Sequence, residues 1–203
     1  MIPHDFLPPF GNVGCVIMAS GMGKRFGGNK LMADFGGMPL ISRILDATEG
    51  IFARRVVVTR HEDVVRLCEG RGIPAILHQL PHRNDTVRLG LETMMHTERC
   101  MFCPSDQPLL RRETVAALAM ASAEAADFIH RPMVNGTEGA PVVFPARLYD
   151  ELLTLPEGKG GGYVIAKHRD SVRYLPINDP FELMDVDTAE DLEDLLRRFR
   201  NRT

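Results

Sequence analysis

The 203-residue sequence has no tryptophan, only four cysteines and a formal net charge of −3. So few cysteines exclude a disulfide-stapled scaffold, and the nearly balanced charge excludes a broadly basic surface for nucleic acid or anionic membrane. No apolar run reaches the roughly 18 residues that a membrane span needs, and residues 1–12 do not resemble a secretory signal. We therefore expect a cytoplasmic globular protein without a nucleic-acid or membrane partner, in which any polyanion site is built from local charges.

The cysteines include one C-x-x-C pair, Cys100 and Cys103. This pair stands in an apolar stretch typical of a buried strand, and there is no second pair to complete a zinc site. Free cysteine is among the most buried residue types. We therefore expect buried, reduced strand residues, with a zinc or redox role as the alternative.

Apolar runs rich in β-branched residues alternate with helical periodicity along the chain. In the first half, strands are predicted at 13–20, 53–60, 73–79 and 100–106, and helices at 39–52, 62–72 and 85–97. In the second half, helices are predicted at 112–127, in 146–155, in 163–169 and at 189–200, and strands at 127–133, 140–145, 171–178 and 182–187.

Strands separated by helices imply right-handed crossovers and a mainly parallel sheet with helices on both faces. No linker or repeat divides the chain, so we expect a leader at 1–12 and one α/β domain at 13–203. Ligands of such sheets bind beyond the carboxyl ends of the strands. The loop after the first strand and the segment 104–110 both lie at that edge.

The loop A-S-G-M-G-K-R-F-G-G-N-K at 19–30 is the strongest local signal. Its glycines let the backbone approach a ligand, and Lys24, Arg25 and Lys30 concentrate positive charge. A dinucleotide fingerprint would not need these cations, and the G-K-S/T of a Walker A loop is absent. The loop therefore predicts a triphosphate site, with a solvated basic loop as the alternative.

Three aspartates are candidate metal ligands. Asp106 follows an apolar strand at the edge of the cationic loop, where a carboxylate beside phosphates is best explained by a shared divalent metal. Asp185 and Asp187 stand two apart in a predicted strand and so share a face. Local alternatives exist: Asp106 begins a turn, and Asp187 or Thr188 caps the last helix, where Thr188 and Asp191 match a capping box.

Two further segments are lesser candidates. The helix at 85–97 could be capped by Asn84, Asp85 or Thr86, and this turn could offer polar groups to a base or sugar. The G-K-G-G-G turn at 158–162 could bend over a second substrate. Ordinary turn and cap chemistry is the alternative for both.

Taken together, these motifs resemble the small nucleotidyltransferases related to molybdenum cofactor cytidylyltransferase and guanylyltransferase. I-M-A-S-G-M-G-K-R-F-G-G-N-K resembles their opening L-A-x-G-x-x-x-R-x-G-x-x-K, with Met18 in place of Leu. S-D-Q-P resembles their metal-binding G-D-Q-P, and G-A-P-V-V-F-P and M-D-V-D-T-A-E-D-L resemble later family elements in the same order. Two segments depart from the family: H-R-N-D-T-V-R-L-G-L lacks its Gly and both serines, and E-G-K-G-G-G lacks its Asp and Arg.

The resemblance implies a single-domain three-layer α/β/α fold with a Rossmann-like, mostly parallel sheet of the glycosyltransferase-A-like type. It implies that a phosphorylated acceptor, molybdopterin in the cofactor enzymes, attacks the α-phosphate of a nucleotide and expels pyrophosphate. A molybdoenzyme client is a further implied partner. Ser20 stands where cytidylyltransferases usually have Ala and guanylyltransferases Gly, which favours CTP.

Residue roles follow from the same resemblance. Arg25 is expected on the β- and γ-phosphates and Lys30 near the α-phosphate, with Asp106 and either Asp187 or Asp185 holding Mg²⁺. The other expected nucleotide contacts are Ala19, Ser20, Gly21, Met22, Gly23 and Lys24, followed by Thr59, Asn84, Asp85 and Thr86. The alternatives are GTP as the nucleotide, a sugar or polyol phosphate as the acceptor, and a protein that binds nucleotide or pterin for cofactor delivery without catalysis.

Overall fold

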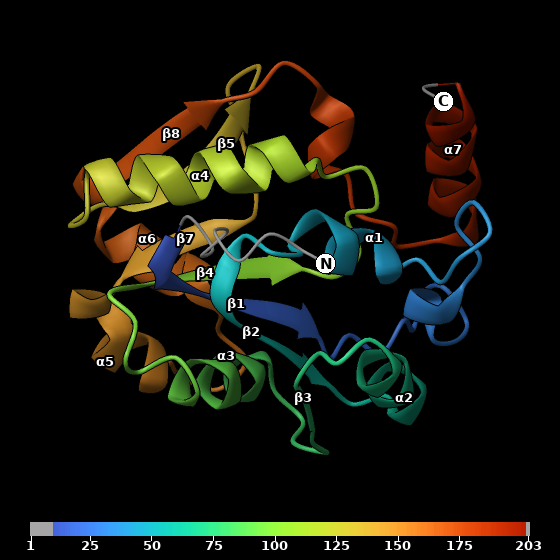
Figure 1. Cartoon of the computed structure of the whole chain (residues 1–203), viewed down its shortest axis with the longest axis horizontal. Coiled ribbons are helices and arrows are strands. Elements are labelled where there is room, and N and C mark those ends of the chain that lie inside the picture. The colour runs from blue at the N-terminus through green and yellow to red at the C-terminus, as the bar shows by residue number, and fades with distance from the viewer. Residues whose placement is uncertain (1–9, 202–203) are drawn as a thin grey trace, which may run out of the picture.

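An eight-stranded sheet forms the centre of the computed structural model, which describes residues 10–201 (Figure 1). Its strands are β1 (Phe10–Ala19), β2 (Phe52–Thr59), β3 (Ala75–Leu77), β4 (Arg99–Pro104), β5 (Ile129–Val134), β6 (Thr137–Glu138), β7 (Val142–Pro145) and β8 (Val172–Pro176). The helices are α1 (Ser42–Ala47), α2 (Glu62–Gly70), α3 (Arg83–Glu92), α4 (Arg112–Glu124), α5 (Tyr149–Leu153), α6 (Gly161–Lys167) and α7 (Ala189–Arg200). Short 3-10 helices lie at Lys30–Met32, Ala146–Leu148, Arg169–Ser171 and Pro180–Leu183. Across residues 10–201, no helix has the length and apolar character needed to cross a membrane.

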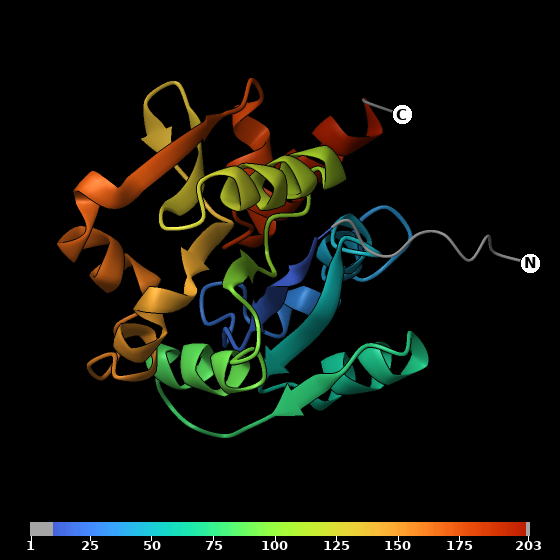
Figure 2. The same ribbon diagram turned by 60° about the vertical axis from the view of Figure 1, so that its left-hand side comes forward.

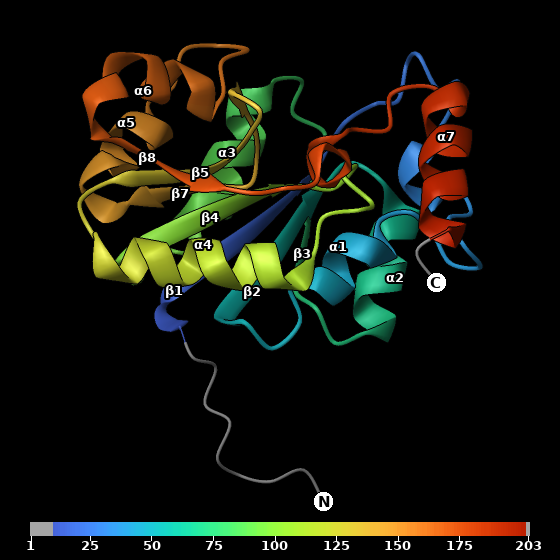
Figure 3. The same cartoon turned by 90° about the horizontal axis from the view of Figure 1, so that it is seen from above.

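Helices cover both faces of the sheet. In β1, Cys15 and Ile17 pack into one core cluster with residues of α1, α2, α4 and α7, whereas Val16 packs into a second with residues of α3, α5 and α6. A strand that is apolar at every position needs cover on both sides because successive side chains point to opposite faces. Figures 2 and 3 show this division, with α4 and α3 on opposite sides of the strands. The predicted three-layer α/β fold is confirmed.

The sheet is parallel in its first half and mixed beyond it. The strand order is β3-β2-β1-β4-β7-β5-β6, with β8 beside β5. In the described part of the chain, four strand pairings are parallel and three, all involving β5 or β7, are antiparallel. β1 begins at Phe10, ahead of the expected domain start at residue 13, and residues 1–9 of the expected leader lie outside the described residues.

Two predicted elements differ from the structure. The strand predicted at 182–187 is wrong. The Asp179 side chain accepts from the Phe181 amide and starts the 3-10 helix Pro180–Leu183. The residues after this helix, up to residue 187, do not pair with any strand of the sheet. The helix predicted at 39–52 is much shorter. α1 spans only Ser42–Ala47, and Gly50, with φ +63°, turns the chain into β2.

The four cysteines are free and buried, as predicted for the C-x-x-C pair. Cys100 packs into one core cluster and Cys103 into the other, because residues an odd number of positions apart in a strand point to opposite faces of the sheet. Burial raises the pKa of both thiols well above the usual range. Because the thiolate is the reactive form, both side chains serve as small apolar core residues.

Candidate active site

A cavity of about 900 Å³ opens at the carboxyl ends of β1 and β4. This is the edge at which the topology of a parallel sheet predicts ligand binding. Six Lys or Arg side chains and four carboxylates line it, together with an apolar wall from β4, β7, α5 and α6. The basic residues are Lys24, Arg25, Lys30, Arg60, Arg83 and Arg131, and the acidic residues are Asp106, Glu138, Asp185 and Asp187. The sequence therefore brings its cationic loop and its three candidate aspartates into one cavity.

Lys30 lies at the centre of the charged cluster. Its Nζ is 2.7 Å from Asp106 Oδ2, 2.5 Å from the Val186 carbonyl oxygen and 3.4 Å from Asp187 Oδ1. Its side chain is only 8% exposed. The backbone is fixed just before it, where Asn29 accepts from the Leu31 amide and donates to Asp63. The ammonium group is thus held against two carboxylates, which offset the cost of burying it.

Arg25 and Asp187 form the outer part of the cluster. Arg25 Nη2 lies 2.7 Å from Asp187 Oδ2, and the Arg25 side chain is 72% exposed. An ion pair this exposed contributes little to stability because water screens it. The guanidinium is therefore free to exchange Asp187 for a ligand phosphate at small cost.

Asp185 and Asp187 reach the same cavity although the segment is not a strand. Val186, fully buried between them, donates its amide to the Asp106 carbonyl oxygen at 2.9 Å. Gln107 Nε2 donates to Asp185 Oδ1 at 3.0 Å. Burial, and then the charge of Asp106, raise the pKa of Asp185. Asp185 and Asp106 therefore repel each other, and a bound cation would relieve this repulsion.

The residues directly after Asp187 form the N-terminal cap of α7. Thr188 accepts from the Asp191 amide, and Asp191 accepts from the Thr188 amide, which is the capping box predicted for the last helix. The Asp187 amide also donates to Asp191, at 3.0 Å. The cap thus uses the backbone of Asp187 and leaves its carboxylate to face Lys30 and Arg25.

The other predicted nucleotide contacts separate into two groups. The residues that line the cavity are Ser20, Gly21, Met22, Gly23, Lys24 and Thr86, and those that do not are Ala19, Thr59, Asn84 and Asp85. The fully buried Thr59 hydroxyl donates to the Ala19 carbonyl oxygen at 3.0 Å, and Asn84 Oδ1 accepts from the Gly158 amide at 2.9 Å. Both side chains therefore hold loops that border the cavity.

The N-cap predicted for the third helix is wrong. His82 occupies the cap position, ahead of the three residues that were expected there. Asp85 instead reaches back from the third helical position to accept from the His82 amide at 3.1 Å. Asp serves here as the N3 partner of a cap, a role that Glu or Gln usually plays.

Several residues in or beside the cavity have no signal in their own stretch of sequence. Arg60 follows β2, and Arg83 and Arg131 come from α3 and β5, so nothing in their local sequence marks them as neighbours. His78, directly after β3, is 8% exposed and contacts Ser20. The topology rule that located Asp106 applies equally to the residues after β2 and β3, and it would have indicated Arg60 and His78.

The first loop depends on glycine at one position. Gly23 has φ +57°, and a Cβ there would overlap the Gly28 carbonyl oxygen, whereas a Cβ on Gly28 would meet open space. We expect Gly23→Ala to raise the dissociation constant for nucleotide at least about tenfold, because the left-handed conformation alone costs about 1–2 kcal/mol. Calorimetric titration measures the effect. Gly28→Ala is the matched control, and equal affinity in the two variants would contradict this account.

Two buried histidines, His78 and His130, are expected to weaken the fold in mild acid. Burial lowers the pKa of both below the usual 6.5; Arg60 and Arg88 lower the pKa of His78 further, and Asp85 opposes them. The unfolded chain therefore takes up protons where the folded chain does not. The two neutral, buried histidines therefore make a contribution to the free energy of unfolding that is complete above pH 6.5. This contribution is lost as the pH falls through the folded-state pKa.

Urea unfolding from about pH 8 to about pH 5 measures this effect. The free energy of unfolding should fall by at most about 1.4 kcal/mol per group for each pH unit below the usual pKa. His130→Gln should flatten the decline, and His96→Asn, at an exposed position, should leave it unchanged. If the free energy of unfolding falls equally steeply with pH in His130→Gln and in the parent protein, His130 does not cause the decline.

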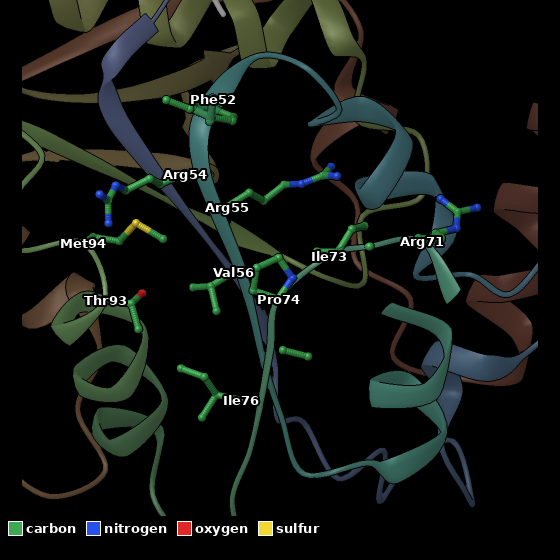
Figure 4. A pocket seen from close by; sticks show the side chains of 13 residues that line it. Phe52, Arg54, Arg55, Val56, Arg71, Ile73, Pro74, Ile76, Thr93 and Met94 are labelled. Atoms are coloured by element: carbon green, nitrogen blue, oxygen red, sulfur yellow. The ribbon is translucent and has the colours of Figure 1, made fainter. Parts of the chain in front are cut away.

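A second cavity, of about 480 Å³, lies at the opposite end of β2 (Figure 4). Figure 4 shows Arg54 on one side of that strand and Arg55 on the other. Arg55 donates to the Leu45 carbonyl oxygen at 2.5 Å, and Arg71 pairs with Asp46 at 2.6 Å. Two of its three arginines are thus committed within the fold, and its lining includes no carboxylate. The larger cavity is the candidate active site.

Comparison with known proteins identifies the family of the chain. A family model described as the MobA-like NTP transferase domain matches residues 15–172. The chain is 24% identical over 187 residues to a probable molybdenum cofactor guanylyltransferase of Aquifex aeolicus, covering 90% of this chain and 89% of that protein. It is 26% identical over 163 residues to a 3-deoxy-manno-octulosonate cytidylyltransferase of Neisseria meningitidis, covering 76% of this chain and 59% of that protein.

Solved structures share the fold. The Rv0371c protein of Mycobacterium tuberculosis aligns with a TM-score of 0.82 at 21% identity, over 92% of this chain and 98% of that one. A structure of the same protein in complex with manganese aligns with a TM-score of 0.76 at 20% identity, over 92% and 98% of the two chains. The family match spans more than half of this chain, including the cationic loop, Asp106 and most of the cavity wall. The chain therefore belongs to the MobA-like NTP transferase domain family.

Proposed function

We propose that this nucleotidyltransferase moves a cytidylyl group from CTP to a phosphorylated acceptor of the molybdopterin kind, with Mg²⁺, and releases pyrophosphate. The observation that carries the proposal is the Lys30 ammonium, held between Asp106 and Asp187 inside a cavity that also contains the glycine-rich loop. Cations and carboxylates side by side suit a metal-bound triphosphate, because the phosphates need cationic partners and the metal ion needs carboxylates.

The nucleotide is expected to lie along the first loop. Backbone amides from Ser20 to Lys24 approach its base, ribose and phosphates, and Ala19, which ends β1, lies outside the cavity lining. Arg25, whose side chain is 72% exposed, meets the β- and γ-phosphates, and Lys30, whose side chain is 8% exposed, meets the α-phosphate. This order is the one that the family resemblance implies, and the burial of Lys30 and the exposure of Arg25 are compatible with it.

The donor set fits Mg²⁺. Carboxylate oxygens suit this ion, which usually takes one or two of them and completes its shell with water and substrate phosphates. Within residues 10–201, no three His, Cys, Asp or Glu side chains are grouped as a ready-made metal cage. Asp106 and Asp187 are therefore proposed to bind the ion together with the nucleotide. Asp185, held by Gln107, is the weaker of the two alternatives to pair with Asp106.

Catalysis is assigned to positioning and charge. An acceptor phosphate oxygen attacks the α-phosphorus in line with the departing pyrophosphate, and no covalent protein nucleophile is needed. Lys30 would stabilise the charge that grows on the α-phosphate oxygens, and Arg25 the charge of the leaving group. A divalent ion bound at Asp106 and Asp187 would add Lewis-acid neutralisation of the phosphates.

The acceptor is proposed to occupy the other half of the cavity. Phe102, Val142, Phe144 and Ile165 form an apolar wall there, and Arg60, Arg83 and Arg131 stand around it. An acceptor with a planar apolar body and an anionic group would suit both the wall and the three arginines, as a pterin phosphate does.

The glycine-rich turn before α6 borders the same half. A Cβ on Gly160 would lie 2.9 Å from Arg83 Nε, and one on Gly161 would lie 2.8 Å from the Phe144 ring. Glycine at these two positions therefore permits the close packing that shapes the wall. The turn is tied to the start of α3 through Asn84 and through His82, whose Nε2 is 3.1 Å from Glu157.

Two observations bear on the choice of nucleotide. Ser20 puts a side chain at the start of the loop, which leaves less room beside the base than Gly would and supports a pyrimidine. The Aquifex relative, named as a guanylyltransferase, supports GTP as the second candidate. A sugar-acid cytidylyltransferase among the relatives keeps a sugar-type acceptor as an alternative.

A panel of acceptors with CTP or GTP and Mg²⁺ tests the proposal by pyrophosphate release. Turnover with CTP and molybdopterin supports it, turnover with GTP alone moves the assignment to guanylyl transfer, and turnover with a sugar or polyol phosphate changes the acceptor. Nucleotide binding without turnover across the whole panel would favour a cofactor-delivery protein. Binding is read from melting-temperature shifts, since a ligand at 100 times its dissociation constant stabilises by about 2.7 kcal/mol.

A further inference from the structure

Ser20 and His78 form a part-buried contact at the start of the glycine-rich loop that follows β1. Ser20 follows β1 and lines the cavity, and its Oγ lies 2.8 Å from His78 Nε2. His78 follows β3, and its amide donates to the Thr59 carbonyl oxygen at 3.0 Å. The imidazole is 8% exposed, so the ring touches the loop from the interior and not from solvent.

The protons of this contact can be assigned. A serine hydroxyl has one hydrogen, and Ser20 Oγ donates it to the Val58 carbonyl oxygen at 3.1 Å. The Oγ must then accept from His78, so Nε2 carries the ring proton. If Nδ1 carried it instead, Ser20 would have to serve two acceptors with one hydrogen. An N–H donor would also be buried at Nδ1, which has no partner among residues 10–201.

The charge state of the ring agrees with this assignment. Burial and the neighbouring Arg60 and Arg88 lower the pKa of His78, against the opposing effect of Asp85. The imidazole is therefore neutral near pH 7 and holds one proton. With Nε2 as the donor, Nδ1 is left as a bare acceptor. Thr86 Oγ1 lies 3.5 Å from the same Nε2, farther away than Ser20 Oγ, and is a second, weaker acceptor of this N–H.

We infer that His78 is a positioning residue that, by donating to Ser20 Oγ, turns this hydroxyl into a pure hydrogen-bond acceptor for the bound nucleotide. The inference rests on the proposed function, because it assigns a ligand group to the same cavity. With its hydrogen given to Val58 and one lone pair taken by His78, Ser20 Oγ has a single lone pair left.

The kind of ligand group that fits is thereby restricted. A lone pair needs an N–H or O–H donor, which an exocyclic amino group, a ring N–H or a ribose hydroxyl supplies. Ionised phosphate oxygens have no hydrogen to donate. Ser20 is therefore assigned to the nucleoside end of the nucleotide, whereas Arg25 and Lys30 are assigned to its phosphates.

The tautomer is tested first, without any ligand. Ring ¹⁵N chemical shifts and long-range ¹H–¹⁵N correlations of His78 in the full chain near pH 7.5 should show a protonated Nε2 and a bare Nδ1. A protonated Nδ1 would overturn the inference whether or not the protein is an enzyme.

The coupling is tested by a double-mutant cycle on CTP affinity, measured by calorimetry with Mg²⁺. Ser20→Ala and His78→Leu should each raise the dissociation constant about fivefold, as expected for one hydrogen bond of about 1 kcal/mol. The double variant should be no worse than either single one. His78→Gln, which can place an N–H near the position of Nε2, should recover most of the affinity.

Each failure has a distinct signature. Additive losses in the double variant, or a His78→Gln variant as weak as His78→Leu, would show that His78 acts only on the fold and would overturn the inference. If the parent protein binds neither CTP nor GTP, the proposed function fails, and the tautomer still decides the geometry of the contact.

Discussion

Replacement of Lys30 by methionine should reduce nucleotidyl transfer by roughly two to three orders of magnitude in kcat/KM. The loss of one preorganised charge at the reacting phosphate typically has an effect of this size. Methionine keeps most of the apolar stem but removes the ammonium group that contacts Asp106, Asp187 and the Val186 carbonyl oxygen. Pyrophosphate release at saturating and limiting CTP measures both kinetic parameters, and most of the loss is expected in kcat.

Stability must be separated from catalysis in this variant. Without Lys30, the half-buried Asp106 loses its counter-ion, so the free energy of unfolding should fall by about 1–3 kcal/mol. Assays are therefore performed well below the melting temperature of the variant. Lys24→Met, an exposed cation in the same loop, is the matched control and should lose less than about tenfold. A folded Lys30→Met protein with activity close to that of this control would show that Lys30 is only structural.

The parallel half of the fold was predictable because its signals are local. The apolar runs of β1, β2 and β4 are buried on both faces, and the periodicity of such runs is visible without knowledge of their neighbours. The segment from Asp179 to Asp187 was not predictable in this way. Its apolar residues mimic a strand, but Asp179 starts a 3-10 helix at Pro180. Val186 packs into a core cluster and donates its amide to the Asp106 carbonyl oxygen, and both contacts come from distant parts of the chain.

The candidate site was predictable to the extent that topology determines it. Lys30 and Asp106, far apart in sequence, meet because their strands are neighbours in the sheet and end at the same edge. The ion pair between Arg25 and Asp187, in contrast, depends on how the last segment passes over the loop. His78 was missed because the residue after the three-residue strand β3 was not considered as a ligand position, although the topology rule places it at the same edge; its contact with Ser20 is seen only in the structure.

The three aspartates are expected to differ sharply in metal binding. Asp106→Asn and Asp187→Asn should each raise the Mg²⁺ concentration for half-maximal pyrophosphate release by roughly tenfold or more, since neutral amides are much poorer ligands for this ion than carboxylates. Each should also lower the maximal rate by about a hundredfold if the ion neutralises the phosphates. Manganese binding in the presence of CTP, followed by electron paramagnetic resonance, measures affinity independently of turnover.

Asp185→Asn is the matched control, with the same substitution two residues from Asp187. The new amide can still accept from Gln107 through its oxygen, so the contact at 3.0 Å is preserved. Because burial and Asp106 raise the pKa of Asp185, its ionised form opposes folding near pH 7, and the neutral variant should melt at a higher temperature than the parent. Its metal affinity should change less than about threefold. If Asp185→Asn instead loses metal as Asp106→Asn does while Asp187→Asn does not, the second ligand is Asp185, and the pairing of Asp187 with Lys30 and Arg25 serves only to hold the loop.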